Sequence, residues 1–292
     1  MNIAIFGKSL QDENLDLIQS LFDKLQSLNH FLLVYEPFYQ KIKDKISFAG
    51  EPKTFREHTE IRSNADYLFS IGGDGTLLDT ITLVRDSGIP IMGINLGRMG
   101  FLSSVSRDRI ESAIEQVMKK NYTIDRRTLL RLDTPNKLFG NLNYALNELS
   151  VYRKEPLSMI KIQAYVDGEL LNSYWADGLI IATPTGSTAY SLSNGGPIIL
   201  PHCRNFVITP IATHNLTVRP VVIPDGSEIR IKVVGRIKDY FVSLDSRSMP
   251  VESSAELKIV REDFFVNLIQ LKDEHYFTTI REKLLWGLDI RN

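Results

Sequence analysis

The first hundred residues alternate between short apolar runs and longer segments with helical spacing. Short apolar runs, which suit buried strands, occupy residues 2–6, 30–35, 67–71 and 89–94. Segments whose apolar residues recur three and four positions apart predict helices at residues 13–29, 76–86 and 108–120. Strands that alternate with helices in this way form a parallel sheet with helical crossovers. Residues 37–63 are polar and mixed and predict no element.

The pattern changes near residue 126, where alternating segments rich in β-branched residues take over. Such segments lie at residues 129–132, 159–166, 179–182, 229–234 and 240–244. Asp167-Gly168 follows one of them and predicts a tight β-hairpin. Residues 278–286 suit a last helix. We therefore predict an α/β N-terminal domain with a Rossmann-like parallel sheet over residues 1–125, completed by residues 270–292, and a mostly-β domain over residues 126–269.

Composition narrows the class of protein but does not decide it. The chain has 292 residues, of which 43% are hydrophobic and 24% charged, and a formal net charge of −1. This balance gives no reason to expect a nucleic-acid partner. The single cysteine excludes an internal disulfide and a cysteine zinc site. The start lacks a signal-peptide pattern, and no apolar run reaches the roughly 18 residues of a membrane span, so we expect a cytoplasmic protein without a membrane partner.

Residues 70–76, Ser-Ile-Gly-Gly-Asp-Gly-Thr, form a glycine-rich turn between a predicted strand and a predicted helix. Backbone N–H groups at a helix N-terminus, together with the helix dipole, favour an anion. Glycine also allows a ligand to approach the backbone closely. A plain tight turn is the alternative. The pattern predicts a phosphate-binding turn made of Gly72, Gly73, Gly75 and Thr76.

Asp74 lies in the middle of this turn. A carboxylate about 4 Å from a phosphate charge is repelled by roughly 4 kcal/mol at an effective dielectric of 20. Asp74 must therefore face something other than the phosphate. It would hold Mg²⁺ that bridges to phosphate, or accept the proton of a hydroxyl, as in phosphoryl transfer. An ordinary helix N-cap is the third interpretation.

Two other segments resemble phosphate motifs only in part. Gly7-Lys8-Ser9 follows the first strand like the end of a P-loop, but the required earlier glycine falls on Asn2. The glycines of Gly93-Ile-Asn-Leu-Gly-Arg-Met-Gly100 have the wrong spacing for a dinucleotide fingerprint. Arg98 within that segment is a candidate phosphate ligand.

Residues 176–197 make up a second unusual stretch, in which a buried strand leads into a loop dense in hydroxyl groups and glycines. Hydroxyls donate and accept hydrogen bonds, which suits ribose, amide or base edges. The loop is not a serine-hydrolase elbow, because no glycine lies two places after Ser187. Its hydroxyl residues are Thr183, Thr185, Ser187, Thr188, Tyr190 and Ser193.

Together these motifs closely resemble the NAD kinases. The resemblance rests on Gly72-Gly-Asp-Gly-Thr76, Thr183-Pro-Thr-Gly-Ser-Thr-Ala-Tyr190, Asn194-Gly-Gly-Pro197 and the pair Asn147-Glu148. It is clearest over residues 65–250. It implies that ATP phosphorylates the 2′-hydroxyl of the adenosine ribose of NAD to give NADP. It also implies a substrate site between an α/β and an all-β domain, a divalent Mg²⁺ or Mn²⁺, and a homodimer or homotetramer.

The resemblance assigns roles to individual residues. Asp74 matches the catalytic acid, as base or metal organiser, and Phe101 matches an aromatic beside the adenine. Asn147 and Glu148 match residues that bind sugar and base groups. The resemblance leaves the metal ligands unspecified. The implied substrate-binding set is Gly73, Gly75, Phe101, Asn147, Glu148, Asp177 near the nicotinamide, Thr188, Ala189, Tyr190, Ser193 and the late acid Asp245.

Two rival functions share some of these features. A lipid kinase of the diacylglycerol or sphingosine type has the same glycine-acid motif. The hydroxyl-rich loop and the lack of a basic amphipathic segment argue against it. A noncatalytic NAD(P) sensor is the other rival, and the intact Asp74 argues against that function.

Overall fold

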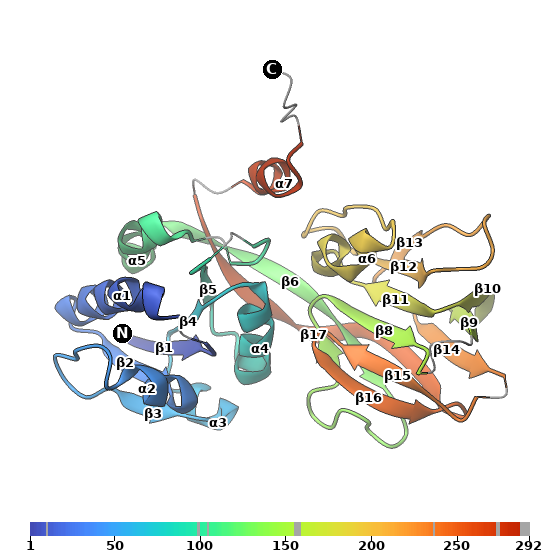
Figure 1. The fold of residues 1–292 in the computed structure, drawn as a ribbon, viewed down its shortest axis with the longest axis horizontal. Helices are drawn as coiled ribbons and strands as arrows, with labels where there is room; N and C mark the ends of the chain where they lie inside the picture. Colours follow the sequence, from blue (N-terminus) through green and yellow to red (C-terminus); the bar gives the residue numbers. More distant parts are fainter. Residues whose placement is uncertain are drawn as a thin grey trace. The chain divides into compact units, whose positions relative to one another are not determined.

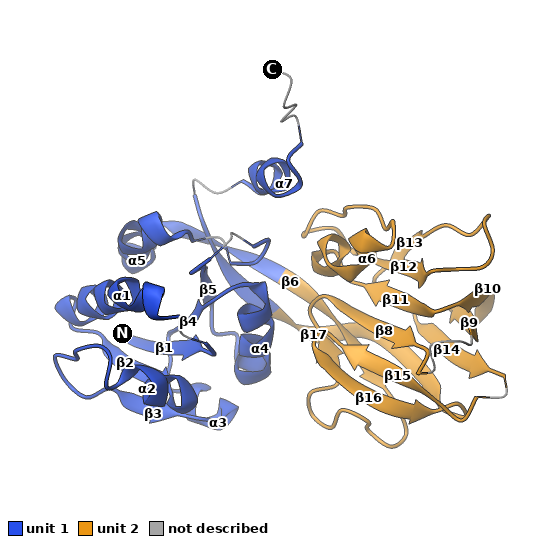
Figure 2. Ribbon diagram, viewed as in Figure 1, with its two compact units in different colours: residues 1–126, 266–292 blue, residues 127–265 orange. Residues whose placement is uncertain are grey.

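The computed structural model describes residues 1–9, 11–97, 100–103, 105–154, 159–235, 237–272 and 275–286 (Figure 1). The chain divides into two compact units, unit 1 with residues 1–126 and 266–292 and unit 2 with residues 127–265 (Figure 2). The long strands β6, Tyr122–Asp133, and β17, Glu256–Leu271, have residues in both units. None of the helices in the described ranges is long and apolar enough to cross a membrane.

Unit 1 contains a parallel sheet with the strand order β5-β4-β1-β2-β3, and the end of β17 pairs with β5. The predicted parallel sheet is confirmed, because each neighbouring pair of these five strands is parallel. β1 and β4 run in register from Ile3↔Tyr67 to Gly7↔Ile71, so their C-terminal ends meet at one edge. The five strands are β1 Asn2–Gly7, β2 Phe31–Tyr35, β3 Lys53–Phe55, β4 Tyr67–Ile71 and β5 Ile91–Ile94.

Helices connect these strands and bury one apolar face against the sheet. In α1, for example, Ile18, Leu21, Phe22 and Leu25 are buried, which is the i, i+3, i+4, i+7 pattern of an amphipathic helix. The segment without a prediction, residues 37–63, holds most of α2 and the short elements β3 and α3. The helices of unit 1 are α1 Leu15–Ser27, α2 Glu36–Ile42, α3 His58–Ile61, α4 Asp74–Val84, α5 Ile110–Met118 and α7 Tyr276–Leu284, with 3-10 turns at Asp12–Asn14, Arg85–Ser87 and Arg107–Arg109.

Unit 2 is a sandwich of two sheets, which confirms the predicted mostly-β domain. One sheet has the order β13-β12-β11-β8-β15-β16, and the other contains β10-β9-β14-β17. Apolar residues from both sheets share one core, as Val151 and Ile181 of the first sheet do with Ile162 and Ile231 of the second. The strands are β7 Tyr144–Ala145, β8 Glu148–Tyr152, β9 Ile160–Val166, β10 Glu169–Ala176, β11 Gly178–Ala182, β12 Asn205–Ile211, β13 Val221–Pro224, β14 Ile229–Val234, β15 Asp239–Leu244 and β16 Arg247–Glu252.

Two local features of unit 2 follow directly from the sequence. The predicted hairpin at Asp167-Gly168 is confirmed: it joins β9 to β10, and both residues have positive φ, 52° and 86°. The hydroxyl-rich loop after β11 folds into a 3-10 turn, Thr185–Thr188, and one short helix, α6 Tyr190–Ser193.

Candidate active site

The glycine turn lies at the C-terminal edge of the unit 1 sheet, between β4 and α4. Gly73 is the N-cap, and α4 begins at Asp74, two residues earlier than predicted. The backbone N–H of Gly72 donates to the carbonyl of Ile94 over 2.8 Å, which fastens the turn to β5. Gly72 has a φ of 147°, and a Cβ on it would lie 2.4 Å from Thr76 Oγ1. The fold itself therefore requires glycine at this position.

Gly73 and Gly75 differ from Gly72, because the folded chain does not require their lack of a side chain. Both are exposed, and a Cβ on either would meet no atom within 4 Å. The first N–H groups of a helix have no acceptor within the helix. The turn thus combines N–H donors at the start of α4 with open space above the backbone. This combination suits an anion that approaches closely.

The carboxylate of Asp74 fastens a distant loop to the turn. Its Oδ2 accepts the N–H of Phe101 over 2.8 Å, and its Oδ1 accepts those of Leu102 and Ser103 over 3.1 and 3.0 Å. A Cβ on Gly100 would lie 1.8 Å from Oδ1, so the loop reaches the carboxylate only through a glycine. A carboxylate has about four acceptor positions. The described residues fill three of them, which leaves one position on Oδ2 for a ligand.

The loop that Asp74 holds includes Phe101 and Ser103, and Asn95 precedes it in the chain. Phe101 is half-buried on it, and Ser103 is fully buried with no hydrogen-bond partner for its Oγ in the described part of the chain. Asn95, also buried, accepts the N–H of Gly97 over 2.7 Å. Arg98, the predicted phosphate ligand of this segment, lies outside the described residues.

A second carboxylate, Asp245 in unit 2, holds another turn in the same manner. Asp245 follows β15 with a positive φ of 51°. Its Oδ2 accepts the N–H of Leu146 over 2.9 Å, and its Oδ1 accepts those of Asn147 and Glu148 over 2.8 and 3.2 Å. The turn at residues 146–148 leads directly into β8 and presents the side chains of the predicted Asn-Glu pair.

The hydroxyl-rich loop holds this turn from its other side. The N–H of Thr183 donates to the carbonyl of Asn147 over 2.9 Å, and its Oγ1 donates to that of Leu146 over 2.5 Å. A Cβ on Gly186 would lie 2.1 Å from the carbonyl oxygen of Asn147, so only glycine fits there. Neither of these two holding roles was anticipated from the sequence, which marked Thr183 only as a hydroxyl and Gly186 only as part of a motif.

Glu148 has the most perturbed side chain of this turn. Its Oε2 is buried and has no hydrogen-bond partner among the described residues. Burial, and after it the negative charge of Asp245, raises the pKa of Glu148 to about 8, although a hydrogen bond from the Tyr190 N–H opposes the rise. The side chain is therefore mostly protonated at neutral pH and keeps an unused oxygen for a ligand.

The loop at residues 183–193 divides its hydroxyls into two groups. Those of Ser187 and Ser191 are buried and bonded internally, the first to the carbonyl of Pro184 over 2.7 Å and the second to Thr209 Oγ1 over 2.8 Å. The predicted ligand residues lie nearer the surface. Among them, Thr188 and Ala189 are half-buried, and Tyr190 and Ser193 are exposed.

Asp177 lies at the other end of this region of unit 2. It precedes β11, whose five residues separate it from Thr183, a distance of about 20 Å along an extended chain. Its carboxylate forms a double ion pair with Arg153, with Nε–Oδ1 at 3.0 Å and Nη2–Oδ2 at 3.1 Å. The structure therefore does not bring Asp177 together with Asn147, Glu148 and Tyr190.

Comparison with known proteins agrees with the resemblance seen in the sequence. Residues 3–122 match the family model for the ATP-NAD kinase N-terminal domain, and residues 146–271 match that for the ATP-NAD kinase C-terminal domain. The chain belongs to the ATP-NAD kinase family. Over 294 residues and 100% of both chains it is 48% identical to the NAD kinase of Flavobacterium psychrophilum. The predicted family is thereby confirmed.

Solved structures of this family have the same fold. An NAD kinase from Archaeoglobus fulgidus in complex with ATP matches with a TM-score of 0.74 and 25% identity over 98% of this chain and 99% of that chain. Yeast NADH kinase complexed with NADH matches with a TM-score of 0.88 and 24% identity over 100% of this chain and 89% of that chain. The second likeness supports the fold alone.

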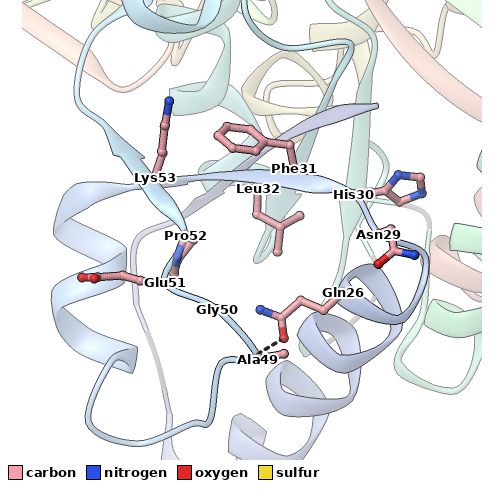
Figure 3. A pocket seen from close by; sticks show the side chains of 10 residues that line it. All are labelled: Gln26, Asn29, His30, Phe31, Leu32, Ala49, Gly50, Glu51, Pro52 and Lys53. Carbon is pink, nitrogen blue, oxygen red and sulfur yellow. Dashed lines mark hydrogen bonds between the residues drawn. The ribbon is translucent and has the colours of Figure 1, made fainter.

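Unit 1 also has a groove of about 370 Å³, which is separate from the glycine turn (Figure 3). It is lined by the end of α1, the start of β2 and residues 49–53, and one wall is fixed by the Ala49 N–H, which donates to Gln26 Oε1 over 3.0 Å. The groove is at the N-terminal ends of β2 and β3. Ligands of such sheets bind at the opposite, C-terminal edge, where the glycine turn lies.

Proposed function

We propose that this chain transfers the γ-phosphate of ATP to the 2′-hydroxyl of the adenosine ribose of NAD, giving NADP. Family membership supports this reaction. The observation that carries it furthest is the glycine turn, in which open space above Gly73 and Gly75 adjoins a carboxylate on which the described residues leave one acceptor position. The turn suits a phosphate, and the carboxylate suits a hydroxyl.

The glycine turn receives phosphates in this proposal. Gly73 and Gly75 leave the backbone accessible, and the N–H groups at the start of α4 stabilise negative charge. Gly72 and Thr76 stabilise the turn itself. The N–H of Gly72 donates to the carbonyl of Ile94, and that of Thr76 donates to the carbonyl of Gly73 over 2.9 Å. A phosphate bound here would lie close to Asp74 and would not have to contact the carboxylate oxygens of that residue.

Asp74 accepts the proton of the attacking hydroxyl. The three N–H donors of residues 101–103 fix the orientation of its carboxylate, and the remaining position on Oδ2 takes the hydroxyl. A correctly placed base contributes about 10²–10⁴-fold to the rate. The same loop carries Phe101, so a hydrogen bond joins the base to the residue proposed to contact the adenine.

The divalent metal of the family would find few protein carboxylates at this site and would take its other ligands from substrate and water. Within the described ranges no three His, Cys, Asp or Glu residues gather into a metal site. Mg²⁺ commonly takes one or two carboxylates and completes its shell with substrate phosphates and water. Asp74 is the carboxylate that would hold it, in place of the hydroxyl, because the contacts of the described residues leave one acceptor position on Oδ2. When bound, the metal would neutralise charge on the transferring phosphate.

The turn at residues 146–148 binds the polar groups of NAD. Asn147 offers an amide, and Glu148 offers a buried carboxyl oxygen with no partner in the described chain. Thr188, Ala189, Tyr190 and Ser193 complete this group. Asp245 supports NAD binding through the backbone of the turn, because its carboxylate accepts three of that turn's N–H groups. Asp177 joins the site only if its ion pair with Arg153 opens.

We also propose that the protein is cytoplasmic and forms a homodimer or a homotetramer. Several large apolar side chains are exposed on the single chain, including Trp175 at 52% and Leu216 at 85%, and burial against another copy would remove them from water. Light scattering coupled to size-exclusion chromatography measures the oligomer directly.

The reaction is tested by incubating purified protein with ATP, Mg²⁺ and NAD and detecting NADP with an NADP-specific dehydrogenase. NADH and a diacylglycerol are run in parallel as acceptors. We expect NADP to form and the lipid to stay unmodified. A phosphorylated lipid without NADP would favour the lipid kinase. NAD binding by calorimetry without any product would favour the sensor.

A further inference from the structure

Lys8 lies beside the glycine turn although it belongs to no recognised phosphate motif. β1 and β4 are parallel neighbours, and Gly7 is level with Ile71. The next residues, Lys8 and Gly72, therefore leave the sheet side by side at the same edge. The backbone there is held in place: the carbonyl of Lys8 accepts a hydrogen bond from Lys41 Nζ, and a Cβ on Gly7 would lie 2.7 Å from the ring of Phe38.

The side chain of Lys8 is much less constrained than its backbone. It is 56% exposed and forms an ion pair with Asp79 of α4. Asp79 follows Gly75 by four residues, which places it about one turn, or 6 Å, along the helix from the glycine turn. Exposed pairs of this kind contribute little to stability. The ammonium group of Lys8 can therefore leave Asp79 for a stronger anion at modest cost.

A nucleotide triphosphate at the glycine turn would provide that anion. It brings several negative charges to a place where the chain itself carries the acids Asp74 and Asp79. The N–H groups of a short turn and a helix dipole offset such charge only in part. In P-loop proteins a lysine reaches the β- and γ-phosphates in the same circumstances. Here strand pairing, rather than sequence adjacency, brings a lysine to the phosphate turn.

We propose that Lys8 is a phosphate-binding residue of the donor site: its Nζ leaves Asp79 and binds the phosphates of ATP at the glycine turn. The inference rests on the proposed function. Asp79 then acts as the resting partner of the lysine and keeps the ammonium close to the turn while no nucleotide is present.

Steady-state kinetics of Lys8→Ala and Lys8→Arg test the proposal. Losing a charged hydrogen bond to phosphate should raise the KM for ATP about 10-fold or more in Lys8→Ala, while the KM for NAD stays within about 2-fold. Lys8→Arg should recover most of the affinity for ATP, which a purely structural role would not predict. Lys24→Ala is the matched control, because Lys24 also forms a Lys–carboxylate pair, with Glu115 at 2.5 Å, and lies in α1.

Asp79→Asn completes a double-mutant cycle. It should lower the KM for ATP by a larger factor when Lys8 is present than in the Lys8→Ala background, where only the repulsion between Asp79 and the phosphates is removed. An unchanged KM for ATP in Lys8→Ala, or a rise confined to the KM for NAD, would overturn the proposal. If the wild-type protein makes no NADP, the proposed function fails. Calorimetric Kd values for ATP in the wild type and Lys8→Ala then decide the role of Lys8 separately.

Discussion

Asp74 in unit 1 and Asp245 in unit 2 each accept hydrogen bonds from three consecutive backbone N–H groups of a distant loop. The pattern is the same atom for atom: the first N–H donates to Oδ2 and the next two donate to Oδ1. The loops are residues 101–103 and residues 146–148. In both places one short acid fixes the path of a segment by accepting its backbone N–H groups.

The surroundings of the two carboxylates differ. Asp74 follows two glycines that leave open space, and the described structure around its loop includes the unpartnered Oγ of Ser103. The loop held by Asp245 is also bonded from its other side by Thr183 and packed tightly by Gly186. The acceptor left for a ligand is thus on the acid itself in unit 1.

In unit 2 the unused acceptor is on the turn, at Glu148 Oε2, rather than on the acid that holds the turn. The same hydrogen-bond pattern therefore supports two different tasks. Asp74 is placed to act on a substrate group directly, whereas Asp245 is placed to act through the residues it holds. Substitutions at the two acids should separate these tasks.

Asp74→Asn should have the largest effect. The asparagine cannot accept a proton, and its NH₂ group cannot accept the N–H donors of residues 101–103. We expect kcat to fall about 10²–10⁴-fold, equivalent to roughly 3–5 kcal/mol of barrier, in the NADP-forming assay. Near-normal kcat in a folded variant would leave Asp74 as no more than a loop anchor.

A variant that disturbs the loop but keeps the carboxyl separates the two contributions of Asp74, because it loses the anchor and retains the base. A Gly100→Ala variant provides the comparison, because its Cβ disturbs the loop but leaves the Asp74 carboxyl in the chain.

The glycines around Asp74 should divide into two classes. Gly75→Ala meets no atom within 4 Å and places a better helix former in α4, so stability should rise by up to about 1 kcal/mol. The added methyl group should nevertheless lower kcat/KM for ATP about 100-fold, because it displaces the phosphate from the backbone. Thermal unfolding and kinetics of one preparation measure both.

Gly100→Ala should behave in the opposite way. Its Cβ would lie 1.8 Å from Asp74 Oδ1, so the variant should lose about 1–3 kcal/mol of stability. Equal stability losses for both alanine variants would mean that the open space above Gly75 is filled by the chain in solution and not kept for a ligand.

Asp245→Asn should have a smaller effect than Asp74→Asn. One N–H acceptor is lost, while Thr183 and Gly186 still hold the turn from the other side. The KM for NAD should rise about 10-fold, as for loss of a buried hydrogen bond, with kcat changed less than about 3-fold. A fall in kcat as large as that of Asp74→Asn would instead place Asp245 among the reacting groups.

Much of the fold follows from patterns that act locally. Short apolar runs predicted β1, β2, β4 and β5, the spacing of apolar residues predicted the longer helices of unit 1, and Asp167-Gly168 predicted its hairpin, because each depends on neighbours a few positions away. α2, β3 and α3 were not predicted, since elements of three to seven residues carry too few apolar positions for a period to be visible. Their stability comes from packing on β2 and α4.

The site was predicted residue by residue more easily than in its arrangement. Motifs identified Asp74, Asn147 and Glu148. They did not predict that Asp74 would bind the backbone of residues 101–103, or that Asp245 would bind that of residues 146–148. The contacts of Asp245 with residues 146–148 span nearly one hundred positions of sequence, and no local pattern records such a contact. The sequence likewise named Ser187 as one of several hydroxyls suited to a ligand, whereas burial reserves it for the fold.

Glu148 provides the smallest and last test of the comparison, through the pH dependence of stability. Its pKa is raised to about 8 in the folded chain, against roughly 4.3 in an unfolded one. The folded state therefore keeps a proton that the unfolded state loses. The stability this confers is fully present below about pH 4.3 and is lost as the pH rises through about 8.

Glu148→Gln keeps the shape of the side chain without the ionisation. Its unfolding temperature relative to the wild type should rise between pH 5 and pH 8.5, by about 5 °C if roughly 2 kcal/mol is recovered. Asp245→Asn should reduce the pH trend of the wild type, because the charge of Asp245 is one cause of the raised pKa. Glu252→Gln, at an exposed glutamate on β16, is the control. A difference between Glu148→Gln and wild type that stays constant from pH 5 to 8.5 would mean that Glu148 is ionised throughout, and that its unused oxygen is solvated rather than kept for NAD.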